Sequence, residues 1–256
     1  MPINFTQIFQ DSLNFMRNQR TITAQFIAIF FAVSLAINFL VTKQISPQIE
    51  TALNQATDPA AAELLANVAV SDDIAVLGFA QLFLTFFISA WGILTFHQLS
   101  ERRTPALGDT LLRTFKRLPG LIFLNLITVF PMIIGVIEIF VAMFNKTSPS
   151  IFSLFAITLG IFVFIRLNLT TVHYLVRPVG VSETIKTVWL SGFKRTAVLF
   201  IYTLLIYFAL PLLVRNLAAF GGNMPFDVLI ALISAVINIF SLIFTYRFYS
   251  LFIQKA

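Results

Sequence analysis

The residues best suited to bind a ligand are cations placed in or beside long apolar segments. Arg166 lies inside an apolar run, and Thr170, His173 and Arg177 follow it at helical spacing. A charge at the centre of a membrane span costs about 2.5–3.5 kcal/mol, so such a residue is a functional candidate by default. This pattern favours binding of an acidic group by the guanidinium, with helix packing or snorkelling of Arg166 as the alternative.

Two further basic clusters stand immediately before apolar runs. Arg113, Lys116 and Arg117 precede one run, and Lys194 and Arg195 precede another. Each basic residue near an anionic membrane surface contributes about 1 kcal/mol of attraction. We therefore count both clusters, together with the Arg166 stripe, as candidate contacts for a lipid head group or another anionic ligand.

Catalytic and metal-binding patterns are missing from the sequence. The chain has no Cys, and its two His residues, His97 and His173, stand 76 positions apart. Without thiolates or clustered imidazoles, neither a zinc site nor a thiol nucleophile is expected. We find no phosphate-binding loop and no nucleophile–base pair, so we expect no cofactor, no metal, no catalytic residues and no enzyme activity.

Composition places these residues in a membrane protein. Of 256 residues, 58% are hydrophobic and only 11% are charged, against about 25% charged in a soluble domain. About 20 apolar residues in a helix cross a bilayer. Six runs reach or approach this length, so we predict an all-α polytopic membrane protein with spans near Ile22–Thr42, Ile74–Phe96, Gly120–Phe144, Ile151–Val176, Ala197–Val214 and Val228–Ile253.

The distribution of charge predicts the orientation of the chain. With the N-terminus inside, thirteen Lys or Arg residues fall in inner segments and three, Lys43, Lys146 and Arg215, in outer ones. Basic segments stay in the cytoplasm, so both termini are expected there, in a bacterial inner membrane. The net charge of +6 then reflects topology, and no nucleic-acid partner is expected. The first run is too long and too far from the start for a signal peptide.

A short pattern recurs before the first, third and fifth runs. It is an acidic, a hydroxyl and an aliphatic residue, as in Asp11-Ser12-Leu13, Asp109-Thr110-Leu111 and Glu183-Thr184-Ile185. In each copy we expect apolar side chains on one helical face and basic ones opposite, as in helices that lie flat in a membrane interface. The apolar faces are expected to hold Phe5, Ile8, Phe9, Leu13 and Met16, then Leu107, Leu111, Phe115 and Leu118, and lastly Val181, Ile185, Val188, Trp189 and Phe193.

The chain is therefore predicted to be one integral membrane domain. Its three repeats, near 1–96, 104–176 and 180–253, each consist of an interface helix and a two-span hairpin. In the outer loop 43–73, Ser46-Pro47 and Asp58-Pro59 favour two short helices, because each is a cap followed by a first-turn proline. Pro131 and Pro211 are expected to kink their spans.

The sequence also resembles the YciC-like family of bacterial inner-membrane proteins. The resemblance rests on "DSLNFMRNQ" at 11–19, "YLVRPVGVSETIKTVWLSGFKR" at 174–195 and "YRFYSLFIQ" at 246–254. The middle segment is also similar, more loosely, to membrane domains joined to glycerophosphodiester phosphodiesterases. The resemblance implies an inner-membrane location and six spans and points towards glycerophospholipids, but it supplies no catalytic residues.

Three hypotheses of function follow. The first is a non-enzymatic component that engages inner-leaflet phospholipid in envelope maintenance. The second is a transporter of a small anionic or amphiphilic solute with Arg166 in its binding site. The third is a membrane scaffold or assembly subunit that docks protein partners through its acidic outer loop.

Overall fold

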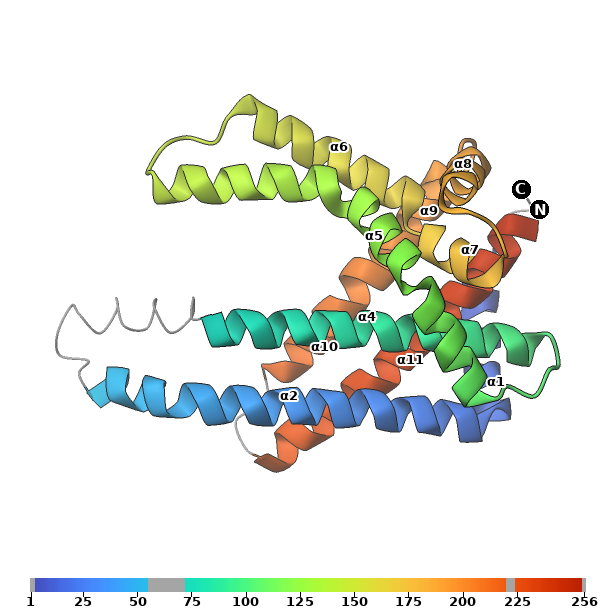
Figure 1. Cartoon of the computed structure of the whole chain (residues 1–256), viewed down its shortest axis with the longest axis horizontal. Helices are drawn as coiled ribbons and strands as arrows, with labels where there is room; N and C mark the ends of the chain where they lie inside the picture. The colour runs from blue at the N-terminus through green and yellow to red at the C-terminus, as the bar shows by residue number, and fades with distance from the viewer. Residues whose placement is uncertain (1–2, 55–71, 220–223, 255–256) are drawn as a thin grey trace. The chain divides into compact units, whose positions relative to one another are not determined.

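The computed structural model describes residues 3–54, 72–219 and 224–254, and these residues form helices and no strand (Figure 1). In chain order the helices are α1 (Phe5–Asn18), α2 (Arg20–Asn54), α4 (Asp72–Ser100), α5 (Leu107–Phe144), α6 (Ile151–Leu167), α7 (Thr170–Val176), α8 (Val181–Ser191), α9 (Thr196–Thr203), η1 (Leu204–Ala209), α10 (Leu210–Ala218) and α11 (Met224–Gln254). The prediction of an all-α protein is confirmed.

Six segments among the described residues are long and apolar enough to cross a membrane. They are Arg20–Val41, Ala75–Ser100, Leu107–Phe144, Ile151–Val176, Thr196–Ala218 and Pro225–Gln254. Many of their large apolar side chains are exposed, including Phe79, Leu82 and Phe208. A polytopic chain needs such side chains on its surface because lipid, not water, surrounds its spans. The six predicted spans are confirmed.

The chain divides into two compact units. Unit 1 consists of Met1–Asn18, Ala90–Leu213 and Phe240–Ala256, and unit 2 of Gln19–Ser89 and Val214–Ile239. In unit 2, α2 buries Phe26, Phe30 and Ile37, which are spaced for one helical face. All residues of the candidate site belong to unit 1.

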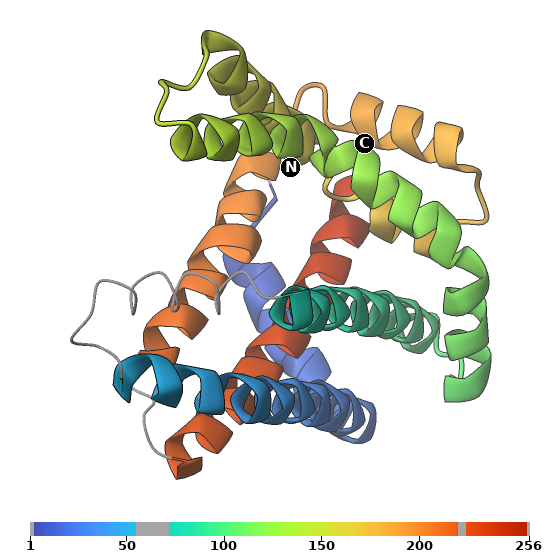
Figure 2. The ribbon, with the colours of Figure 1, turned by 60° about the vertical axis from the view of Figure 1, so that its left-hand side comes forward.

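Helices α5 and α6 form a tight antiparallel pair in unit 1 (Figure 1, Figure 2). Their backbones approach so closely that a Cβ on Gly160 would lie 2.5 Å from the backbone nitrogen of Met132. Gly135 has the same role, since a Cβ there would lie 2.7 Å from the carbonyl oxygen of Ser153. Small residues at a helix crossing allow this contact without side-chain interference.

The core of unit 1 is largely aromatic. The rings of Tyr202 on α9 and Phe248 on α11 are stacked, with centroids 4.3 Å apart. Helix α1 covers α11 through Phe5, whose ring lies 5.7 Å from that of Phe248. The Tyr202 hydroxyl donates to Thr245 Oγ1 at 3.0 Å, so its buried polar end is satisfied. These contacts fix the C-terminal half of α11, which forms one wall of the candidate site.

The predicted fourth span is not one continuous helix. It breaks at Asn168 and Leu169, between α6 and α7. The Thr170 hydroxyl donates to the Leu167 carbonyl at 2.6 Å, and the Asn168 amide donates to the Thr203 hydroxyl. Such side-chain bonds compete with helical ones and allow the chain to change direction. The predicted stripe from Arg166 to Arg177 is therefore interrupted after Arg166.

The fifth span changes its helical form before Pro211. Residues Leu204–Ala209 are π-helical and separate α9 from α10. Proline has no amide hydrogen, so the carbonyl one turn before Pro211 loses its usual partner, and π-helical turns are a common adjustment at such places. Pro131, by contrast, lies within α5, which remains one helix of 38 residues that bends along its length (Figure 1).

Two expected helix boundaries are wrong. The predicted interface helix before the third span and that span are one helix, α5, which continues through Pro119. Helix α2 continues through Pro47 to Asn54, so no separate helix starts at Ser46-Pro47. Proline removes only one hydrogen bond from a helix, and a long helix can continue past it. The expected helix at Asp58-Pro59 lies outside the described residues.

The hydroxyl residues of the recurring pattern are all buried. Ser12, Thr110 and Thr184 are each 0% exposed. Each donates to a backbone carbonyl three or four residues earlier, which satisfies its polar atom. Several residues of the predicted apolar faces are exposed, including Phe9, Leu13, Leu111, Phe115 and Phe193. These faces were expected in the acyl boundary of the membrane, which stays a prediction, whereas burial of the hydroxyl residues was not expected.

Candidate functional site

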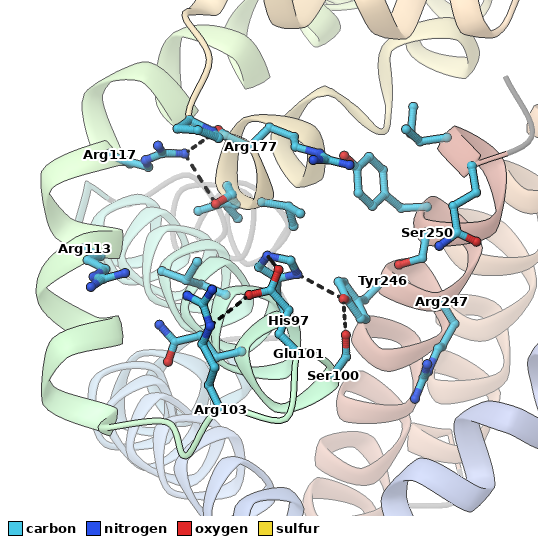
Figure 3. A pocket seen from close by; sticks show the side chains of 18 of the residues that line it. His97, Ser100, Glu101, Arg103, Arg113, Arg117, Arg177, Tyr246, Arg247 and Ser250 are labelled. Carbon is cyan, nitrogen blue, oxygen red and sulfur yellow. Dashed lines mark hydrogen bonds and ion pairs between the residues drawn. The ribbon is translucent and has the colours of Figure 1, made fainter.

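Unit 1 contains a cavity of about 820 Å³ where four helices end or begin (Figure 3). The C-terminal ends of α4 and α11, the segment at the end of α7 and the first turns of α5 form its walls. A cavity of this size suits a ligand with several functional groups, since pockets for drug-sized molecules measure about 300–1,000 Å³.

The lining of the cavity is strongly basic. Six of its side chains are Lys or Arg, and a single carboxylate, that of Glu101, accompanies them. The six cations are Arg103, Arg113, Lys116, Arg117, Arg177 and Arg247. Cations gathered in a pocket repel one another unless an anion joins them, so the lining predicts an anionic ligand.

The Glu101 carboxylate already has two partners. It accepts from His97 Nε2 at 3.3 Å and forms an ion pair with Arg103 Nε at 3.3 Å. His97 Nδ1 lies 3.1 Å from the Tyr246 hydroxyl, which lies 2.6 Å from Ser100 Oγ. A neutral His97 fits this chain, since it donates to Glu101 and accepts from Tyr246. The Glu101 carboxylate is therefore already paired with His97 and Arg103, and it does not neutralise the other cations of the lining.

Arg117 is held by the end of α7. Its guanidinium donates to the carbonyl oxygens of Tyr174 and Arg177, the latter at 2.9 Å, and stands 5.3 Å from the Tyr174 ring centroid. The last carbonyls of a helix have no intrahelical donors, and a cation there also interacts favourably with the helix dipole. Arg117 thus supports a wall of the cavity more than it offers a free charge.

The other four cations have no ion-pair partner among the described residues. Arg113 and Lys116 stand one turn apart on α5, and Arg177 follows α7 next to Tyr249. The Arg247 guanidinium on α11 lies 5.0 Å from the centroid of the Phe15 ring, and its buried Nε has no hydrogen-bond partner. These four residues are the charges available to an anion.

Arg166 is not among the residues that line this cavity. It is 2% exposed and donates to the Trp189 carbonyl and, at 3.1 Å, to Thr196 Oγ1. Its guanidinium also lies 4.8 Å from the centroid of the Trp189 rings. A Cβ on Gly192 would lie 3.2 Å from Arg166 Nη1, so the glycine leaves space for this arrangement. Arg166 ties the end of α6 to the end of α8.

The same arrangement occurs with three arginines of unit 1. Arg117, Arg166 and Arg195 each donate to a carbonyl near the end of another helix and stack on the aromatic ring of that same residue. Arg195 does so with Phe252, whose carbonyl accepts at 3.1 Å. Each contact combines a charge-assisted hydrogen bond with a cation–π interaction. We call these three residues the arginine clamps.

The remaining predicted residues are placed as follows. His173 is buried, and its Nδ1 lies 2.9 Å from the hydroxyl of Tyr249, which lines the cavity. Thr170 closes the break between α6 and α7. Lys194 is exposed and does not line the cavity. Of the predicted contacts, the cavity thus brings together Arg113, Lys116, Arg117 and Arg177.

The other half of this cavity was not predicted from the sequence. Glu101 and Arg103 follow α4, and Tyr246, Arg247 and Tyr249 stand on α11. The basic residues among them, Arg103 and Arg247, count only towards topology in the sequence. The α11 residues of the cavity could have been recognised from the polar group "YRFYS" at 246–250, close to the end of the last apolar run. No group of three potential metal ligands was found among the described residues.

Comparison with known proteins gives one strong match. The chain is 44% identical over 254 residues to an uncharacterized protein of Haemophilus influenzae, and the match covers 99% of this chain and 100% of the relative. No protein-family model and no solved structure matches the chain.

Proposed function

The chain belongs to the same family as the uncharacterized Haemophilus influenzae protein, and from its basic cavity we propose that it is a non-enzymatic membrane protein that binds the head group of an anionic phospholipid. The observation that carries this proposal is a set of four cations in one cavity of about 820 Å³ that have no ion-pair partner among the described residues, namely Arg113, Lys116, Arg177 and Arg247. Guanidinium groups bind phosphate through paired, charge-assisted hydrogen bonds.

The surroundings of the cavity favour an amphiphile over a soluble anion. On α5, Leu112 is 55% exposed and Phe115 is 63% exposed, next to Arg113 and Lys116 in the sequence. Apolar side chains beside cations suit a ligand with a charged head and acyl chains. A transporter of a small anionic solute is the alternative, and it requires movement of solute between the two sides of the membrane.

The proposed place of action is the inner leaflet of a bacterial inner membrane. The excess of basic residues in the segments assigned to the inside, thirteen against three, supports cytoplasmic termini. The cavity lies between the ends of helices, which is where cationic side chains meet phospholipid head groups. The resemblance to the YciC-like family agrees with this location. The proposal also places α1 and α8 flat in the membrane interface.

The proposal is tested by removing two charges from the cavity. The double variant Arg113→Gln, Lys116→Gln should bind phosphatidylglycerol at least about tenfold more weakly than the native chain, since each charge-assisted hydrogen bond contributes about 1.5–3 kcal/mol. Binding is measured with purified protein in detergent by titration with short-chain lipids, and by co-purified lipid.

A matched control removes charge elsewhere. Lys186 is exposed on α8 and does not line the cavity, so Lys186→Gln should leave lipid binding unchanged. Equal binding by the native chain and the double variant would contradict the proposal. Uptake of a small anion into vesicles containing the protein, with no lipid retained, would favour the transporter.

A further inference from the structure

The four available cations stand on separate walls of the cavity. Arg113 and Lys116 belong to α5, whereas Arg247 belongs to α11. Figure 3 shows Arg113 and Arg247 on opposite sides, with His97 and Tyr246 between them. A ligand that contacts both walls must therefore carry acceptor groups at two separated positions.

The charge and the volume of the cavity both exceed the needs of one phosphodiester. A phosphodiester has one negative charge, but four cations of the lining have no ion-pair partner among the described residues. Repulsion among cations is strong in a medium of low dielectric constant, so a ligand with two or more negative charges is favoured. A volume of about 820 Å³ is that of a site for a whole multi-group ligand and not for one phosphate.

Neutral polar side chains also line the cavity. Figure 3 shows Tyr246 between Arg113 and Arg247. Further lining residues that can exchange hydrogen bonds with a hydroxyl group are Gln98, Ser100 and Ser250. Ser100 and His97 fix the Tyr246 hydroxyl, which makes it a fixed point for a bridging group. Cations at both ends and neutral groups between them complement an anion–hydroxyl–anion pattern.

We infer that the cavity takes a lipid head group in which two phosphodiesters are joined by a short, hydroxyl-bearing bridge. One phosphate binds Arg113 and Lys116 of α5, and the other binds Arg247 of α11. This inference rests on the proposed function, because it names the class of lipid that the same cavity selects. The inference predicts that the cavity binds lipids with two phosphates more tightly than lipids with one.

The experiment compares four lipids with the full chain in detergent, by native mass spectrometry. They are cardiolipin, with two phosphodiesters; phosphatidylglycerol, with one; phosphatidic acid, with a single phosphomonoester; and phosphatidylcholine, which is zwitterionic. We expect cardiolipin to bind about tenfold or more tightly than phosphatidylglycerol, since one additional charge-assisted contact has at least this effect.

Variants on the two walls test the two-point contact. Arg113→Gln and Arg247→Gln should each weaken cardiolipin binding about tenfold and remove its advantage over phosphatidylglycerol. Each single variant should change phosphatidylglycerol binding less, by about threefold or below, because a lone phosphate can shift to a remaining α5 cation, whereas two bridged phosphates cannot shift together. Lys186→Gln, outside the cavity, should leave all four affinities unchanged.

The outcomes separate this inference from the proposed function. Equal affinities for cardiolipin and phosphatidylglycerol, both above phosphatidylcholine, would overturn the two-phosphate inference and leave the proposed function standing. Phosphatidic acid binding as tightly as cardiolipin would also overturn it, since charge on one phosphate would then suffice. No preference for any anionic lipid would overturn both.

Discussion

Replacement of Arg166 by leucine should destabilise the protein and leave anionic lipid bound. The guanidinium is 2% exposed, bonds the Trp189 carbonyl and Thr196, and stacks on the Trp189 rings. It does not line the basic cavity. The substitution therefore removes a contact between α6 and α8 and no contact with the proposed ligand.

The expected loss is about 1–3 kcal/mol of unfolding free energy. A desolvated cation–π contact contributes about 2 kcal/mol. Each of the two hydrogen bonds from the charged donor, to the Trp189 carbonyl and to Thr196, adds about 1.5–3 kcal/mol. Two effects oppose these losses: the buried Arg166 Nε has no partner, which costs about 1–3 kcal/mol, and a buried leucine contributes about 1.5–3 kcal/mol. The midpoints of these ranges, about 6.5 kcal/mol lost against about 4.3 kcal/mol gained, leave a net loss of about 2 kcal/mol.

The assay is unfolding of purified protein in mixed micelles, with bound lipid measured in the same samples. Arg166→Lys should be intermediate, because an ammonium keeps the charge but cannot bond two acceptors in the planar geometry of the guanidinium. Greater stability of Arg166→Leu would refute the clamp and make the guanidinium a tolerated burden. Unchanged stability with loss of bound anionic lipid would make Arg166 a ligand contact.

Three further predictions concern packing and topology. Gly160→Ala should cost about 1–3 kcal/mol in the same unfolding assay, because its Cβ would meet Met132, whereas Gly78→Ala, with nothing within 4 Å, should be neutral or stabilising. Thr110→Val should cost about 1–3 kcal/mol, because Trp91 Nε1 loses the nearer of its two acceptors, at 2.9 Å, and keeps only the Leu107 carbonyl at 3.3 Å. Thr158→Val on the exposed face of α6 is the control, and equal effects would refute the burial argument. Reporters fused after Lys255 and inserted after Arg215 should report opposite sides of the membrane, and a periplasmic C-terminus would refute the charge argument.

The spans were predictable because a membrane imposes a simple physical requirement. Backbone groups in lipid must bond within a helix, so each span needs about 20 successive apolar residues, and composition shows this directly. Breaks within spans depend on single side chains. Asn168 and Thr170 interrupt the fourth span through bonds to Thr203 and Leu167, and polar residues in a span can equally bond a neighbouring helix without a break.

The candidate site was predictable only in part. Basic residues before the third span pointed to Arg113, Lys116 and Arg117, and the cavity contains all three. The clamp of Arg166 on Trp189 was not predictable, since it depends on the tertiary position of α8. Arg247 was missed because charge near the end of a span also serves topology, and only the fold brings it to the same cavity as Arg113.

The most direct test of the central claim is lipid mass spectrometry on the chain purified gently from membranes. The account predicts that an anionic phospholipid remains bound, that phosphatidylethanolamine is not enriched, and that Arg113→Gln, Lys116→Gln loses the bound lipid while Lys186→Gln keeps it. Retention of the same anionic lipid by the cavity variant, or recovery of a lipid-free native chain, would contradict the account.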